Sequence, residues 1–289
     1  MQYSTAPSWQ EAREKLRKWR EQNERKSDEI VDLWMTSLGS KVSKAGDEKW
    51  MIIEQVAIAA LDVHNYGVAD DLILKLKERF PDSDRVRFLQ VLRLQALQRY
   101  DDALKGLDAM IQRDNTNSGA YKQKVAILKC QGKNTEAIKE LADYLNKFMS
   151  DQEGWSELCD LYLAESDYAR AAFCAEEMIL HNPHNYFVHQ RLADIRYTMG
   201  GIENTKFASS HYSQALKLNP ESMRAYCGLF LSGSSLATNP RVPATEKREY
   251  SQIASWAAKE ISTRYGENQP PSSNSAEMLE GLFGALQIQ

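Results

Sequence analysis

The chain has 289 residues, of which 43% are hydrophobic and 26% are charged, a composition typical of a folded protein rather than a disordered or fibrous one. Its 36 basic and 40 acidic residues give a formal net charge of −4, so no excess of positive charge indicates nucleic-acid binding. With only 14 glycines and 8 prolines, the sequence favours long helices over many short strands.

Two helices are predicted near the N-terminus. Ser8 and Glu11 have the spacing of a capping box, which satisfies the free N–H groups at a helix start. The apolar stripe of this first helix follows helical spacing at Trp9, Ala12, Leu16 and Trp19. A second helix is expected around Asp28–Leu38. We interpret 1–49 as capping helices, because the end of a repeat array needs an atypical outer face.

Beyond residue 50 a pattern of two helices repeats every 34 residues. Small residues recur at this spacing, at Ala69, Ala103, Ala137 and Ala171. One copy is predicted to form helices at Trp155–Ala164 and Tyr168–Leu180. A 34-residue repeat of two helices is the tetratricopeptide signature. Each alanine is expected where the second helix crosses the first, since a larger side chain there would push the helices apart.

The predicted fold class is therefore all-α, a tetratricopeptide α-solenoid of about five to six helical hairpins. We assign the array to 50–265, with units near 50–83, 84–117, 118–151, 152–185, 186–222 and 223–265. In the fifth unit Pro220 lies 37 residues after Pro183. We expect the three extra residues in the turn between its helices, near "GGIENT" (200–205).

The sixth unit and the C-terminus depart further from the repeat. A loop is predicted at "SGSSLATNPRVPAT" (232–245), because Pro240 and Pro243 disfavour helix. Residues 266–289 are predicted to be a linker followed by a short amphipathic helix. The apolar positions of that helix are Leu279, Leu282, Phe283 and Leu286. This helix either folds back on the last repeat, which we favour, or binds a partner.

No catalytic or phosphate-binding motif occurs in the sequence, so we expect a non-enzymatic protein without a cofactor or metal. Its four cysteines lack metal-site spacing and are expected to be buried and reduced. The histidines at 181, 184 and 189 are interpreted as solvated loop residues rather than metal ligands. No signal pattern is found, and the most apolar run, "MIIEQVAIAALDV", is too short to span a membrane. Any membrane association is therefore expected to be indirect, through partners.

The expected binding surface is the curved inner face of the array, which the first helix of each hairpin lines. Its inward positions are apolar at the start, basic in the middle and acidic later. They are Met51, Glu54, Ile58, Arg85, Phe88, Leu92, Gln95, Lys122, Ala126, Lys129, Glu153, Ser156, Asp160, Phe187, Gln190, Asp194 and Tyr197. This mixture suits an extended peptide held by pockets and a few charge pairs. The alternative for any one of them is an ordinary surface position.

One specific alternative is a clamp for the acidic C-terminal tails of chaperones. Such clamps hold carboxylates with lysine, asparagine and arginine side chains. The matching positions here are Glu54, Ile58, Leu89, Gly119 and Gln123 in one register. Shifting by one unit gives Phe88, Leu92, Gln123, Glu153 and Glu157. Neither register supplies the cations, so we reject the clamp.

Several stretches carry a closer resemblance. They are "LRKWREQNERKSDEIV" (16–31), "RYDDAL" (99–104), "GKNTEAIKELADYL" (132–145), "DQEGWSELCDLYL" (151–163), "DYARAAFCAEEMILHNPHN" (167–185), "YTMGGIENTKFASSHYSQALKLN" (197–219) and "YSQIASWAAKEI" (250–261). Together they resemble the family of second subunits of the endoplasmic reticulum (ER) membrane protein complex. The resemblance runs from about Trp9 to about Ile261.

This resemblance implies a peripheral scaffold on the cytosolic side of the ER membrane. A member of the family would hold cytosolic segments of the membrane subunits and dock a further soluble subunit, number eight or nine. The complex inserts transmembrane segments of tail-anchored and multi-pass proteins, an activity attributed to its membrane subunits. The alternative interpretation is a soluble co-chaperone or a generic peptide-binding adaptor.

Overall fold

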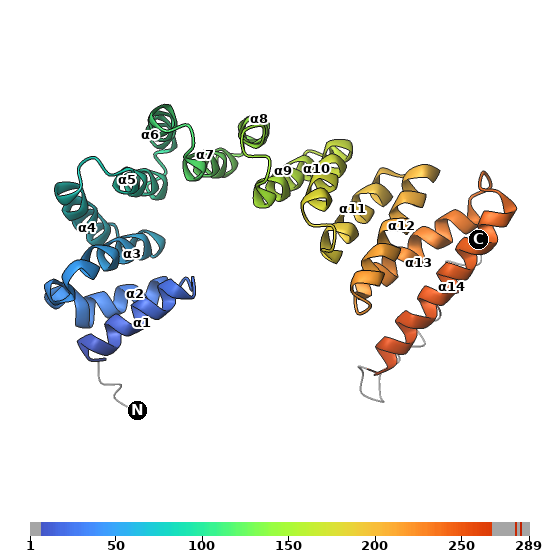
Figure 1. Cartoon of the computed structure of the whole chain (residues 1–289), viewed down its shortest axis with the longest axis horizontal. Coiled ribbons are helices and arrows are strands. Elements are labelled where there is room, and N and C mark those ends of the chain that lie inside the picture. The colour runs from blue at the N-terminus through green and yellow to red at the C-terminus, as the bar shows by residue number, and fades with distance from the viewer. Residues whose placement is uncertain (1–6, 268–280, 282–283, 285–289) are drawn as a thin grey trace. The chain divides into compact units, whose positions relative to one another are not determined.

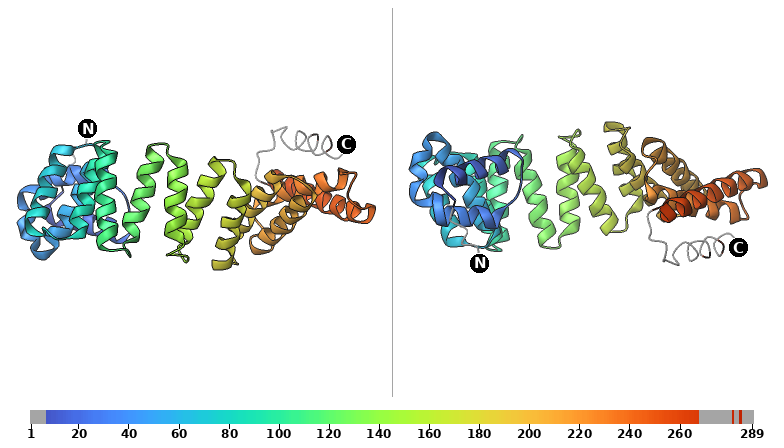
Figure 2. Two further views of the ribbon diagram at one scale, coloured as in Figure 1. Left: turned by 90° about the horizontal axis from the view of Figure 1, so that it is seen from above. Right: turned by 90° about the horizontal axis from the view of Figure 1, so that it is seen from below.

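The computed structural model describes residues 7–267 together with Gly281 and Gly284. The chain divides into two compact units, residues 1–140 and 141–289. Within each unit, successive helices run antiparallel as hairpins (Figure 1). Two further views show the hairpins of each unit stacked side by side (Figure 2). Throughout the described ranges the secondary structure is helical, which confirms the predicted all-α fold class.

The first unit begins with the predicted capping box. Its elements are α1 (Trp9–Glu21), α2 (Ser27–Leu33), a π-helical turn η1 (Trp34–Leu38), a 3-10 segment η2 (Gly39–Glu48), α3 (Lys49–Asp62), α4 (Tyr66–Arg79), α5 (Asp84–Ala96), α6 (Tyr100–Arg113), α7 (Ser118–Cys130) and the start of α8 (Asn134–Leu145). The Ser8 hydroxyl accepts from the Glu11 N–H at 3.3 Å, and the Glu11 carboxylate accepts from the Ser8 N–H at 3.0 Å. Ala12 and Leu16 are fully buried, as the stripe predicted.

The second predicted helix, around Asp28–Leu38, is not one continuous α-helix. It changes to π-helix at Trp34, and 3-10 helix follows as far as Glu48. Trp34 and Leu38 are both buried, so the wider π turn keeps both apolar side chains in the core. A break in the helical backbone at Gly46, with φ 59°, then redirects the chain into α3.

Three arginines of α1 converge on Glu48, the last residue of η2. Arg13 donates to the Glu48 carboxylate at 2.6 Å, Arg17 at 2.8 Å and Arg20 at 3.0 Å. The hydrogen bond from Arg17 is the largest of the effects that lower the pKa of Glu48 to about 2. Because the Glu48 side chain is only 10% exposed, these bonds are shielded and fix α1 against the start of α3.

The four alanines of the 34-residue repeat are all buried. Ala69, Ala103, Ala137 and Ala171 each have no exposed surface. They lie early in the second helix of a hairpin, in α4, α6, α8 and α10. Their complete burial is what the predicted position between two helices requires.

The turns inside the first five hairpins carry a second 34-residue period that the sequence does not reveal. The residues with positive φ at this spacing are His64 (60°), Gln98 (58°), Gly132 (71°), Ser166 (59°) and Gly200 (73°). Only two of the five are glycine, the residue that adopts this left-handed conformation without strain. The backbone geometry of the turn is therefore repeated even where the side chain is not.

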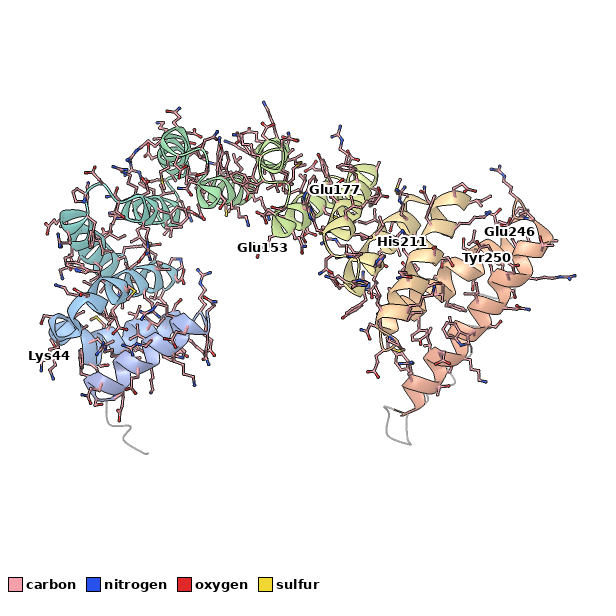
Figure 3. The ribbon with its side chains drawn as sticks, viewed as in Figure 1. Lys44, Glu153, Glu177, His211, Glu246 and Tyr250 are labelled. Atoms are coloured by element: carbon pink, nitrogen blue, oxygen red, sulfur yellow. The ribbon has the colours of Figure 1, made fainter. Side chains whose placement is uncertain are left out.

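The second unit contains the rest of the array. Its elements are the end of α8, α9 (Gln152–Ala164), α10 (Tyr168–His181), α11 (Tyr186–Met199), α12 (Ile202–Leu218), α13 (Met223–Thr238) and α14 (Ala244–Glu267). In Figure 3, Glu153 projects from α9, and Glu177 lies on α10 of the same hairpin. The helices predicted at Trp155–Ala164 and Tyr168–Leu180 are confirmed, with α9 beginning three residues earlier. That start is set by Asp151, whose side chain accepts from the Gly154 N–H.

The extra residues of the fifth unit do not lengthen its turn. Only Gly200 and Gly201 separate α11 from α12, and α12 has 17 residues where α10 has 14. The predicted turn at 200–205 is therefore wrong from Ile202 onward. The Thr205 hydroxyl donates to the Gly201 carbonyl at 2.8 Å, as a side chain within a continuing helix does.

The loop predicted at 232–245 is also wrong in its first half, because α13 continues to Thr238. Ser232, Gly233 and Ser234 are buried, since their small side chains admit close neighbours. A Cβ placed on Gly233 would lie 3.1 Å from the Tyr250 carbonyl and 3.2 Å from the Ala254 Cβ, both on α14. The apparent turn residues are in fact the contact surface of two closely packed helices. The predicted tail helix at 279–286 lies outside the described residues, apart from Gly281 and Gly284.

Candidate functional site

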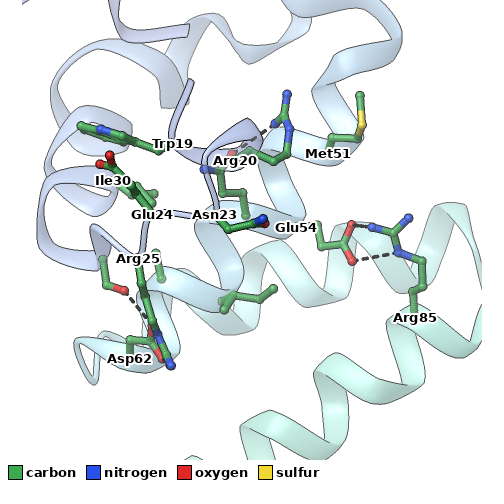
Figure 4. Close-up of a pocket in the computed structure, with 14 residues that line it drawn as sticks. Trp19, Arg20, Asn23, Glu24, Arg25, Ile30, Met51, Glu54, Asp62 and Arg85 are labelled. Atoms are coloured by element: carbon green, nitrogen blue, oxygen red, sulfur yellow. Dashed lines mark hydrogen bonds and ion pairs between the residues drawn. The ribbon is translucent and has the colours of Figure 1, made fainter. Parts of the chain in front are cut away.

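The first unit has an open cleft of about 410 Å³ at the candidate inner face (Figure 4). Its apolar lining comes from three helices, with Trp19 on α1, Ile30 on α2, and Met51 and Ile58 on α3. Met51 is 47% exposed and Ile58 is 37% exposed, so both present apolar surface to solvent. Exposed apolar surface within a cleft suits contact with an apolar side chain.

Four of the six charged side chains that line this cleft form two ion pairs with one another. Arg25 binds both oxygens of Asp62, at 2.8 and 2.5 Å, and the Ser27 hydroxyl donates to the same carboxylate at 2.7 Å. The Arg25 hydrogen bond is the main cause of the lowered pKa of Asp62. Arg85 binds Glu54 in the same two-pronged way, at 3.0 and 2.6 Å. These pairs shape the edges of the cleft (Figure 4).

A second cleft, of about 380 Å³, adjoins the first. It shares Glu54, Ile58 and Arg85 with the first cleft and continues along α5. The other residues that line it are Asp84, Phe88, Leu89, Leu92, Met110, Asn117 and Gly119. Six predicted groove residues are thus brought together in the first unit: Met51, Glu54, Ile58, Arg85, Phe88 and Leu92.

The second unit has a cleft of about 370 Å³. It is lined by Asp160, Leu163, Phe187, Gln190, Arg191, Asp194, Ile195, Thr198 and Arg224. Phe187 is 54% exposed and is its main apolar feature. Gln190 is 5% exposed and accepts from the Ser222 hydroxyl at 2.8 Å, so its polar group already has a partner.

Two of the three acidic residues predicted for this late part of the groove, Asp160 and Asp194, form ion pairs with arginines. Arg191 pairs with Asp160 and also donates to the Ser156 hydroxyl at 3.1 Å. Arg224 donates to Asp194 at 3.0 Å. Asp194 also accepts from the Tyr212 hydroxyl, at 2.6 Å. Arginines of the following hairpin therefore offset the negative charge that the sequence predicted for the later part of the groove.

The sequence prediction missed Arg191 and Arg224. Each pairs with an acid on the first helix of the preceding hairpin, 31 or 30 residues earlier in the chain, as Arg85 does with Glu54. The sequence does contain a signal for these pairs, because each arginine follows an acidic groove residue by about 31 positions. These three pairs link consecutive first helices within their own unit.

The remaining predicted residues lie outside these three clefts. Gln95 accepts a hydrogen bond from Gln123, which joins α5 to α7. The other remaining residues differ in their exposure to solvent. Two of them, Lys129 and Glu153, are exposed, and three are half-buried, namely Lys122, Ala126 and Tyr197. Whether any of them contacts a partner stays a prediction.

His189 is not the solvated loop residue that the sequence suggested. It lies on α11, is 7% exposed, and its Nε2 donates to the Pro183 carbonyl at 2.9 Å. When the ring is neutral, its Nδ1 is the acceptor for Nδ1–H of His211, and these two nitrogens lie 3.1 Å apart. Burial, then the neighbouring His189, lower the pKa of His211. The pair joins α11 to α12, where Figure 3 marks His211.

The prediction of four buried cysteines was half wrong. Cys159 and Cys174 are buried, whereas Cys130 and Cys227 are exposed, and all four are free thiols. Burial raises the pKa of Cys174 to about 12, so this thiol is a poor nucleophile. Among the described residues, no three His, Cys, Asp or Glu side chains are grouped to hold a metal ion. Nor does any helix in the described ranges have the length and apolar character to cross a membrane.

Comparison with solved structures supports the fold. The chain resembles the crystal structure of the C-terminal part of a TPR repeat-containing protein from Cytophaga hutchinsonii. The TM-score is 0.60 at 15% identity, and the match covers 94% of this chain and 98% of the other. At this identity the likeness shows the tetratricopeptide fold alone.

Comparison with protein sequences shows the family. Residues 68–217 match the family described as the EMC2 TPR-like repeat domain. The chain is 45% identical over 284 residues to ER membrane protein complex subunit 2-B of Xenopus laevis, which covers 97% of this chain and 96% of that one. It is 31% identical over 214 residues to ER membrane protein complex subunit 2 of Dictyostelium discoideum, and this match covers 73% of this chain and 66% of that one. The chain therefore belongs to the family of ER membrane protein complex subunit 2.

Proposed function

We propose that this chain is a non-enzymatic scaffold subunit of the ER membrane protein complex, held at the cytosolic face of the ER membrane by its partners. The relatives that carry the name of subunit 2 support membership in that complex. The tetratricopeptide fold supports a scaffold role, because stacked hairpins offer an extended surface for binding other proteins.

The partners in this proposal are cytosolic segments of the membrane-embedded subunits and one further soluble subunit, number eight or nine. By holding these parts together, the scaffold supports the insertion of tail-anchored and multi-pass proteins by the membrane subunits. The observation that carries the proposal is the pair of adjoining apolar clefts on α3 and α5. Apolar clefts open to solvent on a protein of this fold suit side chains of a partner.

A charge placed in the second cleft tests this role. Phe88→Glu puts a carboxylate among apolar side chains, so we expect the recovery of membrane subunits with a tagged chain to fall at least about tenfold. The matched control is Leu180→Glu on α10, because Leu180 is 75% exposed and lines none of the clefts described above. Circular dichroism checks that both variants fold. Equal recovery with the two variants would refute the assignment of these clefts to partner binding.

Fractionation separates the proposal from a soluble adaptor. A scaffold held by membrane subunits should sediment with membranes and be released by carbonate, which strips peripheral proteins. A chain that stays in the supernatant before carbonate treatment would favour the adaptor.

A further inference from the structure

We propose that a further cleft of the first unit, the α4–α5 cleft, is a docking site for an acidic segment of a partner protein. The cleft is lined by residues within 70–77 of α4 and 90–94 of α5. One apolar side chain of the segment enters the cleft, and a carboxylate one helical turn away binds Lys77. The inference goes beyond the proposed function, because this surface shares no residue with the clefts described above.

The α4–α5 cleft faces away from the candidate inner face. Helices α4 and α5 belong to successive hairpins and pack against each other (Figure 1). The cleft between them has a volume of about 420 Å³. Phe88 and Leu92 of α5 line the second inner cleft, whereas Gln90 and Leu94 line this one. Because successive residues of a helix are about 100° apart around its axis, the two sets lie on nearly opposite sides of α5.

The apolar lining of the α4–α5 cleft comes from both helices. Ile73 is 4% exposed, Leu74 is 56% exposed and Leu94 is half-buried. An apolar side chain of a partner that covers Leu74 removes apolar surface of both proteins from water, which favours association. The cleft therefore suits one apolar side chain of a partner.

The charges that line the α4–α5 cleft leave one positive charge without a partner. Three charged side chains line it, namely Asp70, Lys77 and Arg93. Arg93 binds both oxygens of Asp70, one of them through a terminal nitrogen at 2.7 Å. Lys77 is exposed and forms no hydrogen bond or ion pair with any described residue. The charged residues of α4 beside this lining balance one another, and they are Asp71, Lys75, Glu78 and Arg79.

A carboxylate is the group that complements these side chains. Lys77 offers an ammonium, and Gln90 offers an amide that forms no hydrogen bond with any described residue. A carboxylate accepts from both kinds of donor. Leu74 and Lys77 are three residues apart on α4, about 4.5 Å along the helix axis. A partner helix presents an apolar side chain and a carboxylate at a similar separation when they are three or four residues apart.

A protein segment suits the α4–α5 cleft better than a membrane surface. Attraction to anionic lipids takes a cluster of about four to eight lysines or arginines, whereas this cleft has one unpaired cation. Its apolar side chains line a concave surface, so they receive a side chain rather than insert into a bilayer.

The experiment uses the full chain labelled with ¹³C at its isoleucine δ1 methyl groups, because Ile73 lines the α4–α5 cleft and Ile58 lines both inner clefts of the first unit. Ile73→Val and Ile58→Val identify the two resonances. The probe is an alanine-based helical peptide with one leucine and with glutamates three and four positions after it. In one control peptide lysines replace the glutamates, and in another serine replaces the leucine. We expect the probe to shift the Ile73 resonance but not that of Ile58, and to bind about fivefold more tightly than either control.

Variants test the charge and the apolar surface separately. Lys77→Glu should reverse the preference, so that the lysine peptide binds more tightly than the probe. The matched control is Lys75→Glu, which should keep the preference for the probe, because Lys75 is exposed on the same helix but does not line the cleft. Leu74→Glu should abolish the shift of the Ile73 resonance, whereas Leu180→Glu, at an exposed position in the second unit, should leave it unchanged.

Four results with the peptides would overturn the inference. They are no shift of the Ile73 resonance, an equal shift of the Ile58 resonance, equal binding of the glutamate and lysine peptides, and an unchanged preference in Lys77→Glu. Sedimentation with vesicles of phosphatidylserine and phosphatidylcholine tests the membrane alternative, and we expect the chain to stay in solution. Co-sedimentation that Lys77→Glu abolishes would assign the cleft to lipid and refute a protein occupant. The recovery of membrane subunits with a tagged chain tests the proposed function separately from all of these results.

Discussion

The turns of the first five hairpins all contain a residue with a left-handed backbone at the same repeat position. This conformation costs a residue with a Cβ about 1 kcal/mol, whereas glycine adopts it freely. His64, Gln98 and Ser166 bear this cost, and Gly132 and Gly200 do not. The sequence could not identify the non-glycine positions, because histidine, glutamine and serine are common at ordinary surface sites. Only the structure relates these positions, because it shows the same left-handed backbone conformation every 34 residues.

Replacing Ser166 by glycine should therefore stabilise the second unit. We expect Ser166→Gly to raise the free energy of unfolding by about 0.5–1 kcal/mol. The matched control is Ser255→Gly, because Ser255 is exposed in the interior of α14 and glycine lowers helix stability there by about 0.5 kcal/mol. Urea unfolding monitored by circular dichroism measures both. A shift of the two midpoints in the same direction would contradict the account.

The buried histidine pair gives the second unit a pH dependence. In the folded protein the pKa of His211 lies below its ordinary value of 6.5, chiefly because of burial and then because of His189. Nearby Glu176 raises this pKa and Arg196 lowers it, both with smaller effect. Below pH 6.5 the unfolded chain therefore binds protons more readily than the folded one.

We accordingly expect the free energy of unfolding to decrease as the pH falls from about 6.5 through the folded pKa of His211. His211→Gln should make this decrease smaller. His184→Gln, at an exposed position before α11, should leave it unchanged. Urea midpoints at pH 7.5 and 5.5 make the comparison. If the decrease is the same in all three proteins, His211 is not its source.

At the scale of whole helices, small residues decide how closely α13 packs. Gly228 faces the ring of Tyr212, where a Cβ would lie only 2.3 Å from ring atoms. Tyr212 is 2% exposed and its hydroxyl is held by Asp194, so the ring cannot move aside. The prediction ended this helix too early because it extended the loop around Pro240 and Pro243 back to Ser232.

Gly228→Ala should thus destabilise the protein although alanine favours helix. We expect a loss of about 2 kcal/mol or more, because overpacking outweighs the gain in helix propensity. Gly119→Ala provides the contrast, since its Cβ meets only ordinary contacts and should be neutral or stabilising by at most about 1 kcal/mol. Thermal unfolding of both variants checks the difference. The idea of close packing at Tyr212 is wrong if Gly228→Ala is as stable as the parent.

At the scale of the whole molecule, the repeat and its helices could be predicted because they depend on patterns within 34 residues. Ala103 and Ala171 are examples, and both are fully buried as expected. The balance of charge on the inner faces could not be predicted in the same way. Arginines of the next hairpin form ion pairs with Asp160 and with Asp194, and a list of inward residues does not reveal these pairs.

The clefts of the first unit show the same limit. Met51 and Ile58 were correctly placed on one helix face, because helical spacing alone determines that. The contributions of Trp19 and Ile30 come from α1 and α2, outside the repeat. The capping helices therefore do more than cover the first hairpin, since they form one wall of its cleft. No periodicity in the sequence connects them to that surface.

The central claim is that this chain is a scaffold of the ER membrane protein complex. Its most direct test is mass spectrometry of the proteins that co-purify with a tagged copy from membranes dissolved in mild detergent. The account predicts a stoichiometric set of membrane subunits together with one other soluble subunit. Recovery of mainly cytosolic chaperones, with no membrane protein in stoichiometric amount, would contradict it.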